Sequence, residues 1–347
     1  MRKKRLLTLL SCLGLAVAFA LAAFLASQLM RRSQRDRPHS YSPEQLRVDL
    51  DGTLGQSGIC GDALTWVFSA GDGTLTVSGS GEMYEFDAER FADGVPWHEY
   101  TALIRRVRAE DGVTSVSARA FSACPELVEV VLADSVKAVD DLAFNRCPKL
   151  ERATLNGVET LGAGAFSSCG ALRELEAARL RVVGANAFQG CAALTGLPGG
   201  LEQVAQYAFK GCTALTAVRI PAGAALGEGA FYACTGLTEL TLEDGVQTLG
   251  ELCFYGCTAL TAVCIPGSVA ELPTLVFGCC TALRTLTLEN GVAAIGVSAF
   301  QECRALTKLP LPASPGAAGQ PAVLTITVLD RYGAGRFERL YAGLSAQ

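Results

Sequence analysis

Histidine is scarce in this chain, which has only His39 and His98 among 347 residues. No Gly-x-Ser-x-Gly nucleophile elbow and no His-Glu-x-x-His metal motif occurs. The glycine pairs Gly71-Asp-Gly73 and Gly79-Ser-Gly81 lack the lysine and the strand–loop–helix setting of a phosphate loop. Acidic residues are scattered among turns, so no glycosidase pair stands out. We therefore expect a protein that is not an enzyme and needs no cofactor or metal.

Basic charge is also in short supply. Eight of the 29 Lys and Arg residues, and one of the 34 Asp and Glu residues, precede residue 38, so the remainder carries a net charge of −12. Nucleic-acid binding needs a basic footprint. We therefore expect no nucleic-acid partner.

One long apolar run lies near the N-terminus, after the basic residues 1–5. Residues 6–30 carry no charge and, at about 1.5 Å per residue in a helix, exceed a hydrocarbon core of ~30 Å. The run is longer than a cleavable signal core, so we expect a single transmembrane anchor. Cleavage near Ala20-Leu21-Ala22, giving a secreted protein, is the alternative; a lipobox ending at Cys12 is a weaker one. Arginines follow the run too, so charge does not set its orientation.

A short motif repeats nine times along the chain: Phe, then Cys three residues later, then Leu three residues after that. Successive Phe residues are 21 to 23 residues apart. So short a period indicates one small unit stacked on copies of itself, with the repeated residues forming its core. The pairs are Phe121/Cys124, Phe144/Cys147, Phe166/Cys169, Phe188/Cys191, Phe209/Cys212, Phe231/Cys234, Phe254/Cys257, Phe277/Cys280 and Phe300/Cys303.

One unit, residues 237–260, illustrates the expected coil. Leu240-Thr-Leu242 alternates as a strand does, and Glu243-Asp-Gly245 is a turn signal. Val246 and Leu249 lie three apart, which suits a short helical or 3₁₀ return. We predict an α/β repeat solenoid of about ten coils with a parallel β-sheet on one face. The coils that start at Leu172 and Leu194 are short, so we expect an irregularity there.

The repeat pattern AFxxCxxLxxLxL, joined by EDGVxxL or IPxxVxxL turns, resembles the BspA-type leucine-rich repeat of bacterial surface proteins. Ala precedes Phe in seven of the nine units; Cys253 and Val276 replace it in the others. The stretch from Ser57 to Trp97 resembles a module that often precedes such repeats. The resemblance implies a bacterial cell-surface protein, with the repeats outside the cytoplasm, that binds proteins or other macromolecules in adhesion or surface contact.

The expected domains follow from these features. They are a basic cytoplasmic segment (1–5), the transmembrane or long signal segment (6–30), a linker (31–52), a mostly-β N-terminal cap (53–100), the solenoid (101–312) and a C-terminal cap (313–347). The last of these contains an alternating run, residues 322–329, that suits a final strand.

The chain has fourteen cysteines, a number that raises the question of a metal site or of disulfides. Nine of them occupy the same position of successive coils, so their side chains point the same way and do not converge as zinc ligands must. Parallel Cβ vectors also suit a disulfide poorly. We expect buried free thiols and, as a hypothesis, a reducing habitat. Cys264 lies at an outward strand position, where it is either exposed or partly buried.

The outward face of the predicted strands is the candidate binding surface, for a protein or other macromolecule of unknown identity. Its alternatives are a spacer or envelope scaffold that binds nothing, and a glycan-binding accessory that uses Trp66, Trp97 and Tyr100 of the cap. The candidate residues are Glu129, Arg152, Thr154, Glu174, Glu176, Arg219, Glu239, Thr241, Arg284, Thr287 and Lys308.

Overall fold

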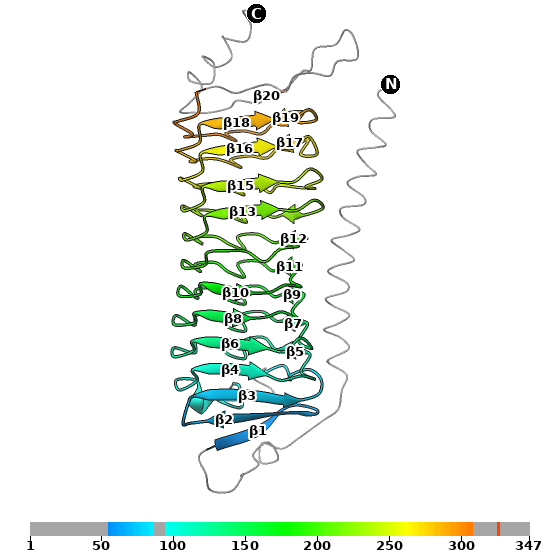
Figure 1. Cartoon of the computed structure of the whole chain (residues 1–347), viewed down its shortest axis with the longest axis vertical. Helices are drawn as coiled ribbons and strands as arrows, with labels where there is room; N and C mark the ends of the chain where they lie inside the picture. The colour runs from blue at the N-terminus through cyan, green and yellow to red at the C-terminus, as the bar shows by residue number, and fades with distance from the viewer. Residues whose placement is uncertain (1–54, 87–93, 308–324, 327–347) are drawn as a thin grey trace, which may run out of the picture. The chain divides into compact units, whose positions relative to one another are not determined.

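The computed structural model describes residues 55–86 and 94–307, together with the backbone of residues 325–326 (Figure 1). All of them belong to one compact unit, residues 47–347. The predicted anchor 6–30 and linker 31–52 lie outside the described residues. Within the described part, no helix has both the length and the apolar character needed to cross a membrane.

Three antiparallel strands open the described chain: β1 (Gly55–Gly61), β2 (Leu64–Ser69) and β3 (Thr74–Gly79). Side chains of β2 alternate strictly between buried and exposed, as expected for a sheet with one solvated face. A 3₁₀ helix, η2 (His98–Tyr100), follows. Strand β3 then pairs in parallel with the first strand of the repeats, so the cap and the solenoid share one sheet.

Eight parallel strands form one side of the coils, here called the front sheet. Seven of them bury alternate side chains, as β13 and β15 do, whereas the inward Leu175 of β10 is only partly buried. Paired strands such as β13 and β15 show no shift in register. The strands stack in chain order (Figure 1). They are β4 (Arg106–Ala109), β6 (Glu129–Leu132), β8 (Arg152–Thr154), β10 (Glu174–Glu176), β13 (Ala217–Ile220), β15 (Glu239–Leu242), β16 (Ala262–Ile265) and β18 (Thr285–Leu288).

The front sheet has fewer strands than the ten or so predicted, because the coil at Leu194 contributes none and the last predicted strand extends beyond the described residues. Gly196 and Pro198 occupy the two outward positions of the Leu194 coil. Proline lacks the N–H that a ladder needs, and glycine gives no side chain to pack. The sheet therefore ends at β10 and resumes at β13, with a further interruption between β15 and β16.

The return side of most coils differs from the prediction: it holds a second parallel ladder instead of a helical turn. In the coil of residues 237–260 this ladder is reduced to an isolated bridge between Ala225 and Thr248. We call its two-residue strands the back sheet. The prediction failed because of the spacing of the buried side chains. Each return carries one inward β-branched or Leu side chain, three residues after the preceding apolar residue, and this spacing is also that of a helix. The strands are β5 (Ser115–Val116), β7 (Ala138–Val139), β9 (Thr160–Leu161), β11 (Val182–Val183), β12 (Gln203–Val204), β14 (Ala225–Leu226), β17 (Glu271–Leu272) and β19 (Ala294–Ile295).

A last strand, β20 (Thr325–Ile326), pairs in parallel with β19. It falls inside the run 322–329, whose alternation predicts a final strand. The chain beyond the repeats thus returns to the end of the back sheet.

Left-handed backbone explains why the Phe-containing turn is not helical. In every coil the residues two before and two after Phe have positive φ; around Phe144 they are Leu142 at 59° and Arg146 at 58°. Their N–H groups and that of Phe144 all donate to carbonyls of the next coil, at 2.8 Å each. An L-residue in this region costs roughly 1–2 kcal/mol. The backbone accepts that cost because alternate N–H groups gain partners that a buried turn would otherwise lack.

The repeated phenylalanines form one continuous stack inside the coils. All nine are buried, and the centroids of neighbouring rings lie 5.1 to 5.8 Å apart. Trp97 heads the stack: its ring lies 5.0 Å from that of Phe121, and its Nε1–H donates to the Ala120 carbonyl at 2.9 Å. The cap therefore closes the open end of the core with a residue that imitates one more coil.

The repeated cysteines form a second buried ladder beside the rings. Eight of the nine donate their S–H to the carbonyl of a Phe in the preceding coil; Cys212 reaches Phe188 O at 3.2 Å. Burial raises the pKa of Cys191 and of Cys234 to about 12, so both keep the proton that they donate. Small size and a weak donor explain why this position takes cysteine.

Cys303, at the end of this ladder, is a core residue as predicted. It is buried and donates its S–H to the Phe277 carbonyl at 3.1 Å, but it is 6% exposed, whereas the other eight are 0% exposed. Cys303 belongs to the last coil of the described range, where its described neighbours come from the side of the Phe277 coil. Cys303 is therefore the least enclosed member of the ladder.

Candidate functional site

Two side chains per strand point outward from the front sheet, and together they make the surface that we call the strand face. On β15, for example, Glu239 and Thr241 are exposed while Leu240 and Leu242 are buried. The alternation follows from the two-residue period of a strand packed on one side only. No segment of the described chain is hydrogen-bonded over this face, so it is open to a partner.

The first outward row carries alternating charge across neighbouring strands. Glu129 on β6 lies in register between Arg106 on β4 and Arg152 on β8. One of its carboxylate oxygens is 3.3 Å from Arg106 Nε, and the other is 3.2 Å from Arg152 Nε. Glu174, next in register after Arg152, is 3.2 Å from Arg173 Nε. Exposed pairs stabilise little, but the network holds these side chains in a fixed array.

The second outward row is bound to the coil that follows it. Thr154 Oγ1 donates to Glu176 at 3.4 Å, within the row. Arg219 Nε donates to Glu243 of the next turn at 2.6 Å. That contact, with the Ala222 N–H, holds the pKa of the Glu243 carboxyl below its usual range. The ion pair ties the guanidinium to the edge of the face, although the Arg219 side chain is still 76% exposed.

Cys264 on β16 is a further outward side chain that contacts a glutamate of the following coil, here through a thiol. It is exposed, which settles the alternative left open by the sequence, and its Sγ lies 3.6 Å from Glu289 Oε1. Partial burial and the nearby Glu289 carboxylate raise the pKa of Cys264. A thiol that is mostly protonated is a poor nucleophile, so the geometry favours no catalytic role for it.

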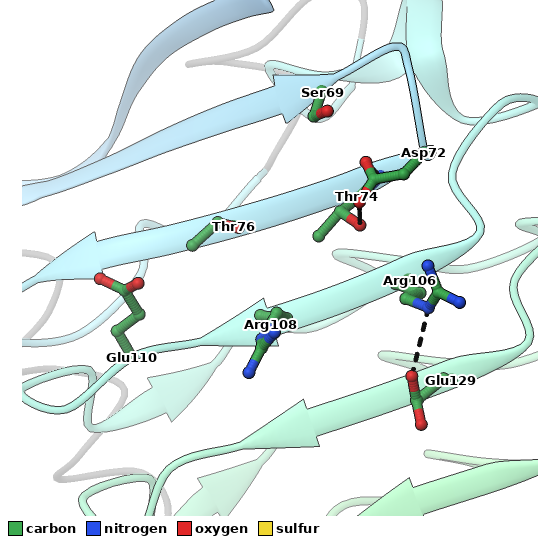
Figure 2. Close-up of a pocket in the computed structure, with 8 residues that line it drawn as sticks. All are labelled: Ser69, Asp72, Thr74, Thr76, Arg106, Arg108, Glu110 and Glu129. Carbon is green, nitrogen blue, oxygen red and sulfur yellow. Dashed lines mark hydrogen bonds and ion pairs between the residues drawn. The ribbon is translucent and has the colours of Figure 1, made fainter.

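A shallow, open hollow marks the junction of the cap and the first coils (Figure 2). Its floor comes from outward side chains of β3, β4 and β6, and its rim from the β2–β3 turn and the end of β4. Only one lining residue, Glu129, was a candidate from the sequence. The lining residues are Ser69, Asp72, Thr74, Thr76, Arg106, Arg108, Glu110 and Glu129.

The predicted strand-face residues fall largely where the alternation puts them. Nine lie on front-sheet strands; Arg284 is exposed in the turn just before β18, and Lys308 lies outside the described residues. The structure joins Glu129 to Arg152 and Thr154 to Glu176. Sequence reasoning missed Arg106 and Arg108, although the out–in–out pattern Arg106-Val107-Arg108 was available to reveal them.

Burial corrects the glycan-binding alternative. The side chains proposed to stack on sugars include Trp66 and Trp97, which are only 4% and 0% exposed. Tyr100 is half-buried, with its ring stacked 4.8 Å from that of Phe68. The two indoles pack against each other edge-on and present no free face to a sugar. These aromatic residues form the core of the cap.

A surface cluster of aromatic rings lies outside the Phe turns of three neighbouring coils. The rings of Tyr232 and Tyr255 stack at 5.1 Å, Tyr207 meets Tyr232 edge-on, and Lys210 Nζ lies 5.2 and 5.3 Å from the ring centroids of Tyr207 and Tyr232. Cys279 Sγ donates to the Tyr255 hydroxyl at 3.1 Å; this bond and partial burial raise the pKa of Tyr255 to about 12. Because the rings cover one another, the cluster covers the turns and offers no stacking platform.

We find no cluster of side chains arranged for catalysis or metal binding in the described ranges. The thirteen cysteines there are free thiols, and eleven of them are buried, Cys303 less deeply than the rest. Within the same ranges no group of three or more His, Cys, Asp or Glu side chains could hold a metal ion. His98 is exposed on η2, and His39 lies outside the described residues.

Comparison with known families gives a match over most of the repeat region. The model of the BspA type leucine rich repeat region matches residues 98–201 and 202–320, in six copies. No functionally curated protein matched the chain.

Three of the similar solved structures come from bacteria. A leucine-rich repeat protein from Eubacterium ventriosum is 21% identical, with 75% of this chain and 85% of that chain covered and a TM-score of 0.38. The Treponema pallidum leucine rich repeat protein is 20% identical, with 70% and 86% covered and a TM-score of 0.37. A leucine rich cell surface protein from Faecalibacterium prausnitzii is 18% identical, with 87% and 98% covered and a TM-score of 0.33.

Proposed function

Because the chain belongs to the BspA-type leucine-rich repeat family, we propose that it is a bacterial surface protein that binds a protein or other macromolecule through its strand face. The role is adhesion or surface contact, without catalysis. The observation that supports this proposal is the strand face itself. It is a regular, solvent-exposed array of Arg, Glu and Thr side chains on a rigid sheet. Solenoids characteristically use such faces for extended partners.

The rigidity of the face favours binding. Outward side chains are held in register by the parallel ladders beneath them and by the Arg106–Glu129–Arg152 network. A partner that contacts this array has few side chains to immobilise, and ordering side chains is one of the costs of association. The interruption of the front sheet at residues 194–200 divides the face into a charged N-terminal part and a C-terminal part richer in Thr and Ala.

The test is capture of a partner by the purified full-length chain in detergent, from host matrix proteins, host-cell extracts and the producer's own envelope. Thr154→Arg and Thr241→Arg each place a bulky charge on one part of the strand face. Thr160→Arg makes the same change on the exposed side of β9, in the back sheet. We expect a saturable partner that one of the face variants loses and the back-sheet variant keeps. A partner kept by both face variants would refute the strand face as the site.

A structural spacer is the second candidate, and the internal pairing of the face favours it. Arg219 and Glu243, for example, satisfy each other rather than projecting toward a partner. If no pool yields a saturable partner, the spacer is the better description. A glycan-binding accessory through the cap is no longer a candidate on its original residues, because the indoles are buried.

Anchoring through residues 6–30, with the repeats outside the cytoplasm, is part of the proposal. We expect the chain to stay with membranes after alkaline carbonate extraction and to keep its original N-terminus. A mature chain that begins after Ala22 and appears in the medium would establish the secreted alternative.

A further inference from the structure

Arg108 is a charged side chain without a partner on the strand face. It is exposed at the second outward position of β4, in register with Thr76 of β3 and Val131 of β6. No hydrogen bond or ion pair joins its guanidinium to any residue of the described chain. The other arginines of the front-sheet strands, Arg106, Arg152 and Arg219, all contact a carboxylate.

The carboxylates around Arg108 are engaged elsewhere. Both oxygens of Glu129 face other arginines, Arg106 and Arg152. Asp72 accepts from the Thr74 hydroxyl at 2.8 Å and from the Thr74 N–H at 3.1 Å. These bonds and one from Ser69 lower the pKa of the Asp72 carboxyl, so its charge is fixed on its own turn.

Glu110 is the remaining carboxylate of the hollow, and it points the other way. Figure 2 shows its carboxylate directed toward β3, while the Arg108 guanidinium points away from it across β4. Glu110 follows directly after β4, two residues beyond Arg108, yet the two form no ion pair. The guanidinium therefore keeps its donors free in an open hollow of about 510 Å³, a size typical of ligand sites.

We propose that Arg108, with the Thr76 hydroxyl beside it, binds a carboxylate of an acidic segment in the protein partner. A guanidinium presents two parallel N–H donors that match a carboxylate, which makes it selective for such a group. The inference rests on the proposed function, because it names the partner chemistry for the same strand face. A peptide suits the hollow better than a glycan, because none of the lining side chains is an aromatic ring on which a sugar could stack.

The experiment measures binding of a short synthetic peptide of alternating Thr and Glu to the full-length chain in detergent, by calorimetry. The matching peptide with Gln in place of Glu tests the carboxylate. Arg108→Gln removes the charge. Arg181→Gln removes another exposed guanidinium, beside β11 in the back sheet. We expect the Glu peptide alone to bind, and Arg108→Gln to weaken binding about tenfold or more, as loss of a charge-assisted pair predicts. Arg181→Gln should bind like the unaltered chain.

Equal binding of the Glu and Gln peptides, or no effect of Arg108→Gln, overturns the inference. The inference is also overturned if Arg108 binds polygalacturonate in preference to the Glu peptide. In that case the carboxylate that Arg108 recognises belongs to a glycan. Failure of the proposed function has a different result. In that case no partner is captured from any pool, regardless of whether the synthetic peptides bind. A captured partner that Arg108→Gln retains leaves the proposed function standing and refutes only the role of Arg108.

Discussion

Truncation of one ring in the phenylalanine stack is the sharpest test of the core. Phe209 is fully buried, with the rings of Phe188 and Phe231 each 5.2 Å away, at interplanar angles of 5° and 7°. Phe209→Ala empties a site closed on both sides by neighbouring coils. Such a site cannot collapse without moving two other rings. We expect a loss of about 3–5 kcal/mol in the free energy of unfolding.

Two further variants calibrate that loss. Phe209→Leu keeps most of the side-chain volume and should cost about 1–2 kcal/mol. Phe300→Ala truncates the last ring of the stack, whose only stacked ring among the described residues is Phe277 at 5.8 Å. Its cost should be smaller than that of Phe209→Ala, because one side of the cavity is less tightly enclosed.

The assay is thermal and urea unfolding of each variant followed by circular dichroism. For a domain of this size a loss of 1 kcal/mol lowers Tm by roughly 2–4 °C, so Phe209→Ala should melt about 6–20 °C below the unaltered chain. A Tm within about 2 °C of the parent, with an unchanged urea dependence, would refute the reasoning. A drop for Phe300→Ala that equals that of Phe209→Ala would show that ring stacking adds nothing beyond burial.

Three other predictions concern single side chains. Ala233→Gly should raise the free energy of unfolding by about 0.5–1 kcal/mol, because φ is 56° there and glycine adopts this region without strain. An unchanged or lower urea midpoint would contradict this prediction. Glu289→Gln should speed alkylation of Cys264 near pH 8, since removing the carboxylate lowers the raised thiol pKa and increases the thiolate fraction; an equal or slower rate, by mass spectrometry, would count against it. Gly229→Ala should destabilise the fold, because its Cβ would overlap the ring of Tyr207 at a φ of 55°, and the added change Tyr207→Ala should recover part of the loss; a simple sum of the two single costs would rule out the contact.

Burial of the thiols bears on the hypothesis of a reducing habitat. Eleven described cysteines are buried in the folded chain, and eight, from Cys147 to Cys303, donate to a carbonyl. The folded state therefore protects its own thiols, and exposure to oxidants is a hazard mainly during folding. The habitat stays a hypothesis, checked by counting free thiols in the denatured chain handled without air.

The candidate site could be predicted only in part. Alternation along Glu239-Leu-Thr241 places two side chains outward, and this is enough to list most of the strand face. The alternation does not predict the direction in which a long side chain points. Arg219 turns along the edge to Glu243, whereas Arg108 stays free in the hollow. That difference arises from which carboxylates neighbouring coils supply, and those lie 20 or more residues away.

The cysteine ladder shows the same limit in the core. The repeat predicts that all nine side chains lie in the core, and all nine are buried, but it does not predict how deeply each is enclosed. Cys303 is 6% exposed while Cys280, one coil earlier, is 0% exposed. Enclosure depends on the coils that lie on both sides of a residue, so the pattern of a single unit cannot reveal it.

The sequence by itself determined the repeat, the inward Phe and Cys positions and the parallel front strands, because burial of apolar side chains at a fixed period leaves one way to stack. Only the tertiary structure decided what the return side is. A two-residue strand carries one buried side chain, too short a signal to distinguish from a helical turn. Its pairing with the next coil, and the left-handed residues around Phe144 that make alternate N–H groups face that coil, exist only when coils stack. The position of Trp97 at the head of the ring stack likewise depends on neighbours that no local pattern encodes. The missing strand at residues 194–200, in contrast, is marked in the sequence by Gly196 and Pro198.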